Sequence, residues 1–442
     1  MNVGENLSRK TFTCRAIIPA IIIIFAICIL NQYRLSKAVT STSTKVAVIV
    51  TKENKIEKIP DYKELKPNLK ITTGPKIILF WTEWEENVPW QERFGTEADL
   101  RSCSPGLCKF TSDKNYINKA HAVLFKSDRI DLRHLPPRTR YRDQRWVWVA
   151  MESPLSPEGQ RSIALLQRLG SWNINWTMTY HPHAEVLAMS GFLDSFLTVP
   201  KSLRPSLISE HEHALNSYLE DMALNKTLRD AMGVKWLDFV VRPKLLMSWF
   251  EGNCNTTSKR EEYAQKLGQY VHLESYGSCG KFTCKMWGYQ DDVDGCWKKY
   301  MATKYLFALV MEDYLCDHYT TQGLYRVLEN GLVPIVWGGT QYSSILPPGS
   351  YIEARRYHPL DLGNLLTAIQ RDLVAYGKYH LWRNYWTVKR KGSLCELCHR
   401  LHNDTTRGHH TNIPKWRRET EQCTVAPLRM FDGDKWKGVI YQ

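Results

Sequence analysis

The sequence lacks the marks of a nucleic-acid-binding protein. Its 59 lysines and arginines outnumber its 45 acidic residues and give a formal net charge of +14, and such an excess can attract nucleic acid or an anionic surface. The basic residues are nevertheless scattered, with no dense basic arm and no zinc-finger or RNP-like motif. We therefore expect no nucleic-acid partner. A diphosphate-bearing small molecule or a membrane surface accounts for the charge equally well.

Long hydrophobic runs are also scarce, and the longest lies near the N-terminus. Residues 16–30 are broken only by Pro19 and Cys28, and residues 31–33 can extend the run. At about 1.5 Å per residue the segment spans roughly 22–27 Å, which is short for a membrane helix but fits a thin bilayer. A cleaved signal peptide is the alternative, although no clear small-residue cleavage site follows. We predict a cytoplasmic tail at 1–15, a transmembrane signal anchor at 16–33 and an extended stem at 34–75.

The spacing of a zinc site is missing too. Cys395 and Cys398 form a C-x-x-C pair, but four residues separate Cys103 from Cys108, so no second pair has that spacing. Ten of the 12 cysteines follow the anchor, together with four Asn-x-Thr sequons, at Asn175, Asn225, Asn255 and Asn403. This combination favours disulfides over metal ligation and predicts glycosylation in the secretory lumen.

The remainder of the chain alternates strand-like and helix-like segments, which is typical of an α/β fold. Apolar runs predict strands at 77–81, 120–125, 146–151, 176–180, 245–250, 271–276, 304–311 and 332–337. Helix-compatible segments lie between several of them, at 162–169, at 261–267 and from Thr320 or Thr321 up to Gly331. Strands joined in this way form right-handed βαβ units, whose ligands bind at the carboxyl ends of the strands.

Three features lie where those ligands bind. Glu152 directly follows a predicted strand, and a partly desolvated carboxylate there suits a general base, although a helix-capping or surface glutamate gives the same pattern. The helix that begins near Thr320 directs N–H groups towards the same edge, which suits a phosphate. Arg260, at the start of another helix, can also grip a phosphate. For residues 304–339, a core βαβ unit that binds no ligand remains the alternative.

Four segments in order resemble the α1,3-fucosyltransferases of glycosyltransferase family ten. Residues 145–154 read RWVWVAMESP and resemble the family's R-W-V-W-x-x-x-E-S-P, and residues 175–180 are similar to its N-W-T-M-T-Y. Residues 242–263 resemble the segment that opens the family's donor domain. Residues 304–339 are similar to F-E-N-S, D-Y-x-T-E-K and V-P-V-V in sequence. The resemblance covers roughly residues 76–404.

The resemblance implies a GT-B architecture, in which two Rossmann-like domains face each other across a cleft. It places an acceptor-side domain at 76–240, a donor domain for GDP-fucose at 241–390 and a cysteine-containing tail that packs back on the body at 391–442. It also implies a single-pass type II protein of the Golgi membrane with a luminal catalytic domain. Its partners would be GDP-fucose and a glycan acceptor on a glycoprotein or glycolipid.

The implied reaction is inverting transfer of fucose to a GlcNAc hydroxyl in α1,3 linkage. Glu152 would be the general base, and Arg260, Tyr319 and the helix N-terminus would neutralise the departing GDP diphosphate. The resemblance adds four further donor-binding candidates: Glu312, Asp313, Gln322 and Arg326. No metal site and no obligatory cofactor are expected, with a divalent cation at most a stimulant, and the D-x-D of Asp292 and Asp294 is interpreted as a solvated loop.

The resemblance also implies disulfides. Cys103 and Cys108 would pair with Cys395 and Cys398, and Cys254 with Cys296.

The chain departs from the family in its most chemical motifs. The family's T-E-K stands as Thr321-Gln-Gly, so Gly323 replaces a lysine that pairs with phosphate, and F-E-N-S becomes Met311-Glu-Asp-Tyr, which adds the charge of Asp313. The family's Y-R-R-D-S-D stands as YHPHAE at 180–185, without arginine. Two functions therefore stay open: an active fucosyltransferase, or a catalytically weak or inactive relative that binds glycans or partner enzymes. The acceptor is open as well, between N-acetyllactosamine and the core GlcNAc of an N-glycan.

Overall fold

The computed structural model describes residues 74–85, 88–94, 107–137, 143–169, 174–197, 205–240, 245–283, 295–390, 392–404, 408–427, 430–432 and 435–436. The chain divides into two compact units, Met1–Ile56 and Glu57–Gln442, and every described residue belongs to the second. Within the described residues, no helix has the length and apolar character needed to cross a membrane. The predicted tail at 1–15, anchor at 16–33 and all but the last residues of the stem lie outside them.

The first half of the described chain forms a six-stranded parallel sheet. Its strands are β1 (Lys76–Phe80), β2 (Cys108–Thr111), β3 (Ala122–Lys126), β4 (Arg145–Ala150), β5 (Trp176–Thr179) and β6 (Val186–Leu187), in the order β2-β1-β3-β4-β5-β6. Every residue of β3, β4 and β5 is buried. Such continuous apolar runs are expected of parallel strands covered on both faces.

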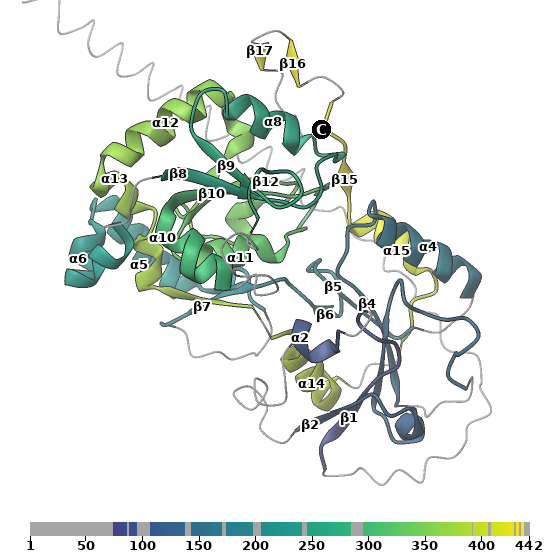
Figure 1. The fold of residues 1–442 in the computed structure, drawn as a ribbon. Helices are drawn as coiled ribbons and strands as arrows, with labels where there is room; N and C mark the ends of the chain where they lie inside the picture. Colours follow the sequence, from purple (N-terminus) through teal and green to yellow (C-terminus); the bar gives the residue numbers. More distant parts are fainter. Residues whose placement is uncertain are drawn as a thin grey trace, which may run out of the picture. The chain divides into compact units, whose positions relative to one another are not determined.

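The second half forms a five-stranded parallel sheet, drawn in green in Figure 1. Its strands are β8 (Leu245–Phe250), β9 (Leu273–Tyr276), β10 (Tyr305–Met311), β12 (Val333–Trp337) and β13 (Ile352–Glu353), in the order β13-β12-β10-β8-β9. Helix α8 (Arg260–Leu267) follows β8, α11 (Gln322–Glu329) lies between β10 and β12, and α12 (Pro359–Arg371) follows β13.

Both sheets follow the same doubly wound plan. Numbered along the chain within each sheet, the strands run 2-1-3-4-5, with β6 added at the edge of the first sheet. In such sheets a crevice opens where the chain order reverses, between strands 1 and 3 at their carboxyl ends. These points lie between β1 and β3 in the first sheet and between β8 and β10 in the second. The predicted α/β class with parallel strands is confirmed.

The segment after residue 385 contributes to both sheet regions. Strand β14 (Trp386–Lys389) pairs antiparallel with β7 (Phe192–Ser195), α14 (Ser393–Asn403) packs apolar residues into the first-sheet core, and α15 (Ile413–Thr420) contacts α4 (Pro157–Leu169). Strand β15 (Cys423–Thr424) pairs with β11 (Leu315–Cys316). The other α-helices and strands of the described residues are α2 (Trp90–Phe94), α5 (Glu212–Ala223), α6 (Leu228–Met232), α7 (Leu237–Val240), α10 (Ala302–Lys304), α13 (Leu373–Lys378), β16 (Phe431–Asp432) and β17 (Lys435–Trp436).

Disulfides link pairs of described cysteines at three places. Cys108–Cys398 agrees with the pairing that the resemblance implies, whereas Cys103 lies outside the described residues and Cys395 is itself disulfide-bonded. The predicted Cys254–Cys296 bond is wrong, because Cys254 pairs with Cys279. Strands β8 and β9 are neighbours, so the loops that follow them lie together and bring the two Cα atoms to 5.2 Å. The third bond, Cys316–Cys423, has no counterpart among the predictions.

Candidate active site

Glu152 follows β4 at the carboxyl end of the first sheet. Its Oε2 accepts the backbone N–H of Met151 at 3.1 Å, and its Oε1 lies 3.4 Å from Nζ of Lys126. Lys126 is almost fully buried, also pairs with Asp128 at 3.0 Å and lies over the ring of Trp84 at 4.8 Å. The side chain of Glu152 keeps 22% of its surface exposed. The carboxylate is therefore held by two contacts and remains partly open to solvent.

The backbone of Glu152 is fixed from the far end of the chain. Arg417, on α15, donates from Nη2 to the carbonyl oxygen of Glu152. Its Nε pairs with Glu421 at 2.5 Å, and neither side chain of this ion pair is exposed. The guanidinium also lies over the ring of Trp148, 5.4 Å from its centroid. A buried charge with so many contacts is rigid, so Arg417 sets the position of the loop that carries Glu152.

Glu312 follows β10 at the carboxyl end of the second sheet and is 1% exposed. Its Oε1 accepts the N–H of Thr321 at 2.9 Å and the hydroxyl of Thr321 at 3.3 Å, so this carboxyl caps α11. Burial raises the pKa of Glu312 to about 7, against the two hydrogen bonds from Thr321 and the charge of Arg260. Part of the predicted phosphate-binding helix terminus is thus taken by a side chain of the same protein.

Arg260 is buried between two carboxylates. Its Nη1 lies 2.8 Å from Oε2 of Glu251 and 2.6 Å from Oδ1 of Asp313, and its guanidinium also donates to the carbonyl oxygens of Met311 and Asn253. Burial raises the pKa of Glu251, and Arg260 opposes that shift. The predicted phosphate-gripping arginine is therefore already neutralised by two acidic partners. Glu251 had no place in the sequence prediction, although it directly follows a predicted strand.

Tyr319 connects the two sheet ends. Burial raises the pKa of its phenol well above 10, and the negative charges of Glu312, Asp313 and Glu152 raise it further. Its ring meets that of Tyr180 edge to face at 5.2 Å, and its carbonyl oxygen accepts the hydroxyl of Thr340 at 2.7 Å. A phenol that stays protonated can donate a hydrogen bond to an anionic leaving group.

Two further cations lie near these groups. Arg326, one of the predicted donor-binding residues, lies on α11, and Arg93, which the sequence analysis did not single out, lies on α2. Nη2 of Arg93 donates to the hydroxyl of Ser190 at 3.0 Å. Burial lowers the pKa of Arg93, while Glu152 and Tyr319 favour its charged form and Arg326 disfavours it. Arg93 lies in a segment without strand or helix periodicity, so no sequence pattern identifies it.

Gln322, another of the predicted donor-binding residues, is the first residue of α11.

The loops that follow the two sheets touch directly. The hydroxyl of Ser153, next to Glu152, lies 3.1 Å from Sγ of Cys316, and the Cys316–Cys423 disulfide and the β11–β15 pair anchor that loop to the C-terminal segment. The Glu152 loop and the loop leading to Tyr319 are thus in contact.

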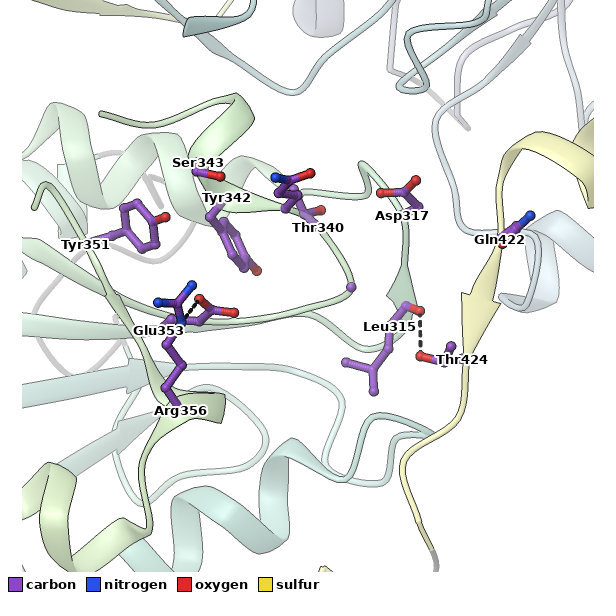
Figure 2. Close-up of a pocket in the computed structure, with 12 residues that line it drawn as sticks. Leu315, Asp317, Thr340, Tyr342, Ser343, Tyr351, Glu353, Arg356, Gln422 and Thr424 are labelled. Carbon is purple, nitrogen blue, oxygen red and sulfur yellow. Dashed lines mark hydrogen bonds and ion pairs between the residues drawn. The ribbon is translucent and has the colours of Figure 1, made fainter. Parts of the chain in front are cut away.

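A cavity of about 420 Å³ lies beside the loop that leads to Tyr319, on the side of the second sheet (Figure 2). Its lining residues are Leu315, Asp317, Gly339, Thr340, Gln341, Tyr342, Ser343, Tyr351, Glu353, Arg356, Gln422 and Thr424. The rings of Tyr342 and Tyr351 lie 5.8 Å apart, and Glu353 is paired with Arg356 at 2.6 Å. The cavity thus combines aromatic faces with carboxylate and amide groups, which is the composition of many small-ligand sites.

A second cavity, of about 720 Å³, opens at the carboxyl ends of β1 and β3, the point where the order of the first sheet reverses. Trp81, Trp84 and Trp90 contribute aromatic surface, and Asp131 and His134 contribute polar atoms. Indole faces beside polar groups suit the apolar faces and hydroxyls of a sugar.

The predicted modification and metal sites differ in their surroundings. Asn225, Asn255 and Asn403 are exposed and remain predicted glycosylation sites. Asn175 is buried; its Oδ1 accepts the N–H of Trp146 and its Nδ2 donates to the carbonyl of Gly408, which argues against a glycan there. Asp292 and Asp294 lie outside the described residues.

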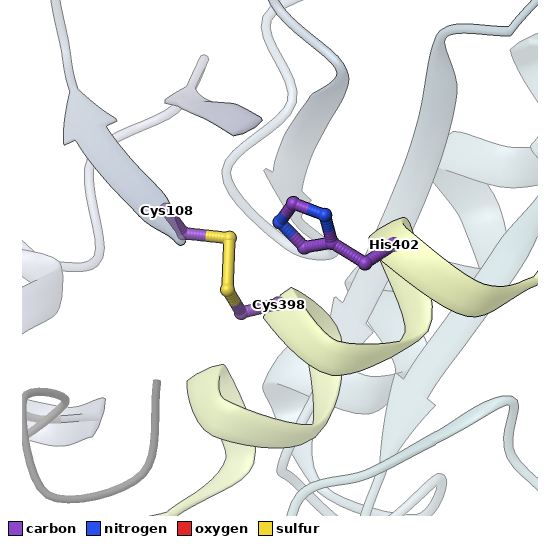
Figure 3. Close-up of side chains that lie close together, drawn as sticks. All are labelled: Cys108, Cys398 and His402. Carbon is purple, nitrogen blue, oxygen red and sulfur yellow. A yellow bond between two sulfur atoms is a disulfide. The ribbon is translucent and has the colours of Figure 1, made fainter. Parts of the chain in front are cut away.

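His402 lies beside the Cys108–Cys398 bond (Figure 3), but a disulfide supplies no thiolate, and Nε2 of His402 is within hydrogen-bond distance of the carbonyl of Leu107 at 2.9 Å. This group therefore does not form a metal site.

Both sheets are doubly wound and carry acidic and cationic side chains after the carboxyl ends of their strands, which is where α/β proteins bind ligands. Two sequence models of one family match: "Fucosyltransferase, N-terminal" over residues 73–191 and "Glycosyltransferase family 10 (fucosyltransferase) C-term" over residues 241–416. The chain belongs to glycosyltransferase family 10, the fucosyltransferases, and is a glycosyltransferase.

Individual relatives are distant. The chain is 28% identical to α-(1,3)-fucosyltransferase C of Drosophila melanogaster over 351 residues, which cover 76% of each protein. It is 22% identical to GDP-fucose protein O-fucosyltransferase 3 of Xenopus laevis over 76% of this chain and 66% of that protein. A crystal structure of an α1,3-fucosyltransferase with GDP-fucose aligns with 80% of this chain and 96% of that one, at 15% identity and a TM-score of 0.43.

Proposed function

We propose that the protein transfers fucose from GDP-fucose to a GlcNAc hydroxyl of a glycoprotein or glycolipid glycan, with inversion and in α1,3 linkage. The observation that carries the proposal is the contact between the loops that follow the two sheets. Ser153, next to Glu152, lies 3.1 Å from Sγ of Cys316, and the ring of Tyr319 packs against that of Tyr180 at 5.2 Å. A GT-B cleft between two Rossmann-like domains is the architecture that this arrangement supports.

The reaction is a single displacement at the anomeric carbon of fucose. The acceptor oxygen forms a bond to that carbon as the bond to the β-phosphate oxygen breaks, and GDP leaves with the electron pair. Glu152 takes the acceptor's proton. Lys126 stabilises the negative charge of Glu152 before the reaction, and the protonated Tyr319 donates to the diphosphate as charge develops. Arg93 and Arg326 add positive charge to the same region.

The donor's base fits the cavity of about 420 Å³. The faces of Tyr342 and Tyr351 can pack against a purine, and the carboxylate of Glu353 can accept the N–H groups of guanine. Thr340 lines this cavity and bonds to Tyr319, which brings a nucleotide there next to the proposed diphosphate position. The mechanism requires no metal.

The acceptor fits the first-sheet side. The larger cavity offers indole surface and polar edges, which favour a carbohydrate over a peptide. Among the relatives, one name specifies a 4-galactosyl-N-acetylglucosaminide acceptor and another a protein acceptor, so both acceptor kinds occur among proteins similar to this chain. The disulfides require an oxidising compartment, which supports a Golgi protein with its catalytic part in the lumen, held by the predicted anchor.

Three features favour a second candidate, a fucosyltransferase-like protein with little or no catalysis that binds glycans or partner enzymes. Arg260 is held by Glu251 and Asp313, Glu312 caps α11, and Gly323 has no side chain. These features weaken the attraction of the site for a diphosphate.

A binding and turnover experiment separates the two functions. The full chain, purified in detergent, is melted with GDP or GDP-fucose, because a ligand that binds only the folded state raises the melting temperature. We expect saturable stabilisation of the wild type and of Glu152→Gln alike, but fucose transfer to a GlcNAc-terminated glycan only by the wild type. Glu158→Gln, a partly exposed glutamate on α4, is the matched control and should retain transfer. Absence of nucleotide binding by a folded protein, or full transfer by Glu152→Gln, would overturn the proposal.

A further inference from the structure

Two histidines and a carboxylate converge beside Tyr319 without a role in the reaction described above. His181 follows β5, and Asp317 and His318 follow β11; one potential ligand atom from each lies within 4.8 Å of the others. The rings of His181 and His318 meet at 5.0 Å between centroids, and that of His183 lies 4.9 Å from His181. The cluster thus joins the loops on the two sides of the Tyr180–Tyr319 contact.

The spacing within the cluster suits a shared ion better than direct hydrogen bonding. Nε2 of His318 lies 3.7 Å from Oδ1 of Asp317, which is too long for a hydrogen bond. Two ligands of a tetrahedral zinc ion, with bonds of about 2.1 Å, lie about 3.4 Å apart. Because all three ligand atoms lie within 4.8 Å of one another, an approach of at most about 1.4 Å brings any pair to this spacing. Edge-to-face packing accounts for the two rings but not for the carboxylate beside them.

The ligands are also held in place before any ion binds. The N–H of Asp317 donates to the carbonyl of Gln422 at 2.8 Å, and the neighbouring Cys316–Cys423 disulfide anchors this loop. His318 has a φ of +55°, a conformation that residues other than glycine seldom adopt. On the other side, the N–H of His181 donates to the hydroxyl of Thr179 at 3.1 Å and its carbonyl accepts the N–H of Ala184. Preorganised ligands of this kind lower the cost of binding.

The cluster combines a buried ligand with an open approach. His181 is 3% exposed, whereas the side chains of His318 and Asp317 are 22% and 47% exposed. Asp317 also lines the cavity of about 420 Å³, where Figure 2 shows it between Thr340 and Gln422. One existing contact competes with metal binding: the N–H of His183 donates to Nδ1 of His181 at 3.2 Å. A neutral imidazole that binds a metal through either ring nitrogen can no longer accept this hydrogen bond.

We propose that His181, Asp317 and His318 bind a divalent transition-metal ion, with zinc as the preferred ion. Two imidazoles and one carboxylate form a ligand set that suits zinc, and three protein ligands leave a position for water or a substrate oxygen. The ion cross-links the loop after β5 to the loop after β11. This proposal is independent of the proposed transfer reaction, in which none of the three residues has a role.

The test uses tag-free full chain stripped with EDTA and titrated with Zn²⁺ by calorimetry, and with Co²⁺ to detect the visible absorption of a tetrahedral site. The variants are His318→Asn, because asparagine tolerates a positive φ, and Asp317→Asn. His272→Asn, whose histidine side chain is 62% exposed and lies away from the cluster, is the matched control. Circular dichroism and the melting temperature without metal show whether each variant is folded.

We expect the wild type and His272→Asn to bind one Zn²⁺ and to gain thermal stability from it. Loss of a partner that merely orients a metal ligand costs about 10–100-fold in affinity, so loss of a ligand predicts at least that for both variants. The tetrahedral cobalt spectrum should disappear in His318→Asn. No Zn²⁺ binding by the wild type, or undiminished binding by the two folded variants, would overturn the proposal.

Discussion

A lysine at position 323 is expected to strengthen the binding of GDP. Gly323 is the second residue of α11, and a Cβ built there meets Thr321 Oγ1 at 3.6 Å, an ordinary contact, so a side chain fits without movement of the backbone. From this position an ammonium group can reach an anion at the helix N-terminus. A charge-assisted hydrogen bond to phosphate is worth roughly 1.5–3 kcal/mol, so the dissociation constant for GDP should fall about ten- to a hundredfold.

Gly323→Ala is the matched control for this prediction. Either replacement removes a flexible residue from a helix and should stabilise the fold by about 0.5–1 kcal/mol. In the lysine variant, repulsion by the positive end of the helix dipole lowers this gain in folding stability by about 0.3–1 kcal/mol when no anion is bound. Urea unfolding measures the stability of each variant, and calorimetric titration with GDP measures affinity.

The two variants should differ about ten- to a hundredfold in their affinity for GDP, but by no more than about 1 kcal/mol in stability. If the lysine and alanine variants bound GDP equally well, the diphosphate would not lie at the N-terminus of α11, and the placement of the donor would be wrong.

Three further outcomes follow from buried groups and cross-links. Burial raises the pKa of Glu312 to about 7 from its usual 4.5, so ionising this carboxyl in the folded protein costs increasingly more free energy between these pH values. Glu312→Gln removes that cost and should stabilise the fold little at pH 4.5 but by up to roughly 3 kcal/mol above pH 7. Urea unfolding at a series of pH values measures the difference. Removing Cys316–Cys423, with a separation of 107 residues, should cost about 1 kcal/mol more than removing Cys254–Cys279, with 25, and equal losses would contradict the loop-entropy argument. Glu421→Gln leaves the buried charge of Arg417 unpaired and should destabilise the fold by about 3–5 kcal/mol in thermal and urea melts.

The sequence predicted the central strands well because parallel strands buried on both faces are continuous apolar runs. The predicted strand at 304–311 is β10 (Tyr305–Met311), and that at 332–337 is β12 (Val333–Trp337). Because the polar residues after such strands must lie at one edge of the sheet, the positions of Glu152 and Glu312 could be anticipated. Strands such as β6, β11 and β13 were not predicted, since two residues carry no periodicity and depend on their partners.

The electrostatic state of the site was not predictable from local sequence. Whether Arg260 meets a phosphate or a carboxylate depends on Glu251 and Asp313, which come together because β8 and β10 are neighbours in the sheet. Likewise, Arg417 contacts the backbone of Glu152 across a separation of 265 residues. Which charged group a side chain contacts is decided by the tertiary fold, and the short motifs that identify the family do not specify it.

The bond between Cys316 and Cys423 also bears on when the site can be completed during biosynthesis. The loop that leads to Tyr319 is made more than a hundred residues before its covalent partner, so a nascent chain can fold the second sheet while this loop is still untethered. The disulfide can form only after Cys423 has been synthesised and where an oxidant is present. Protein made in a reducing cytosol would therefore contain every residue of the site but lack this bond, and so expression in such a host is a poor test of activity.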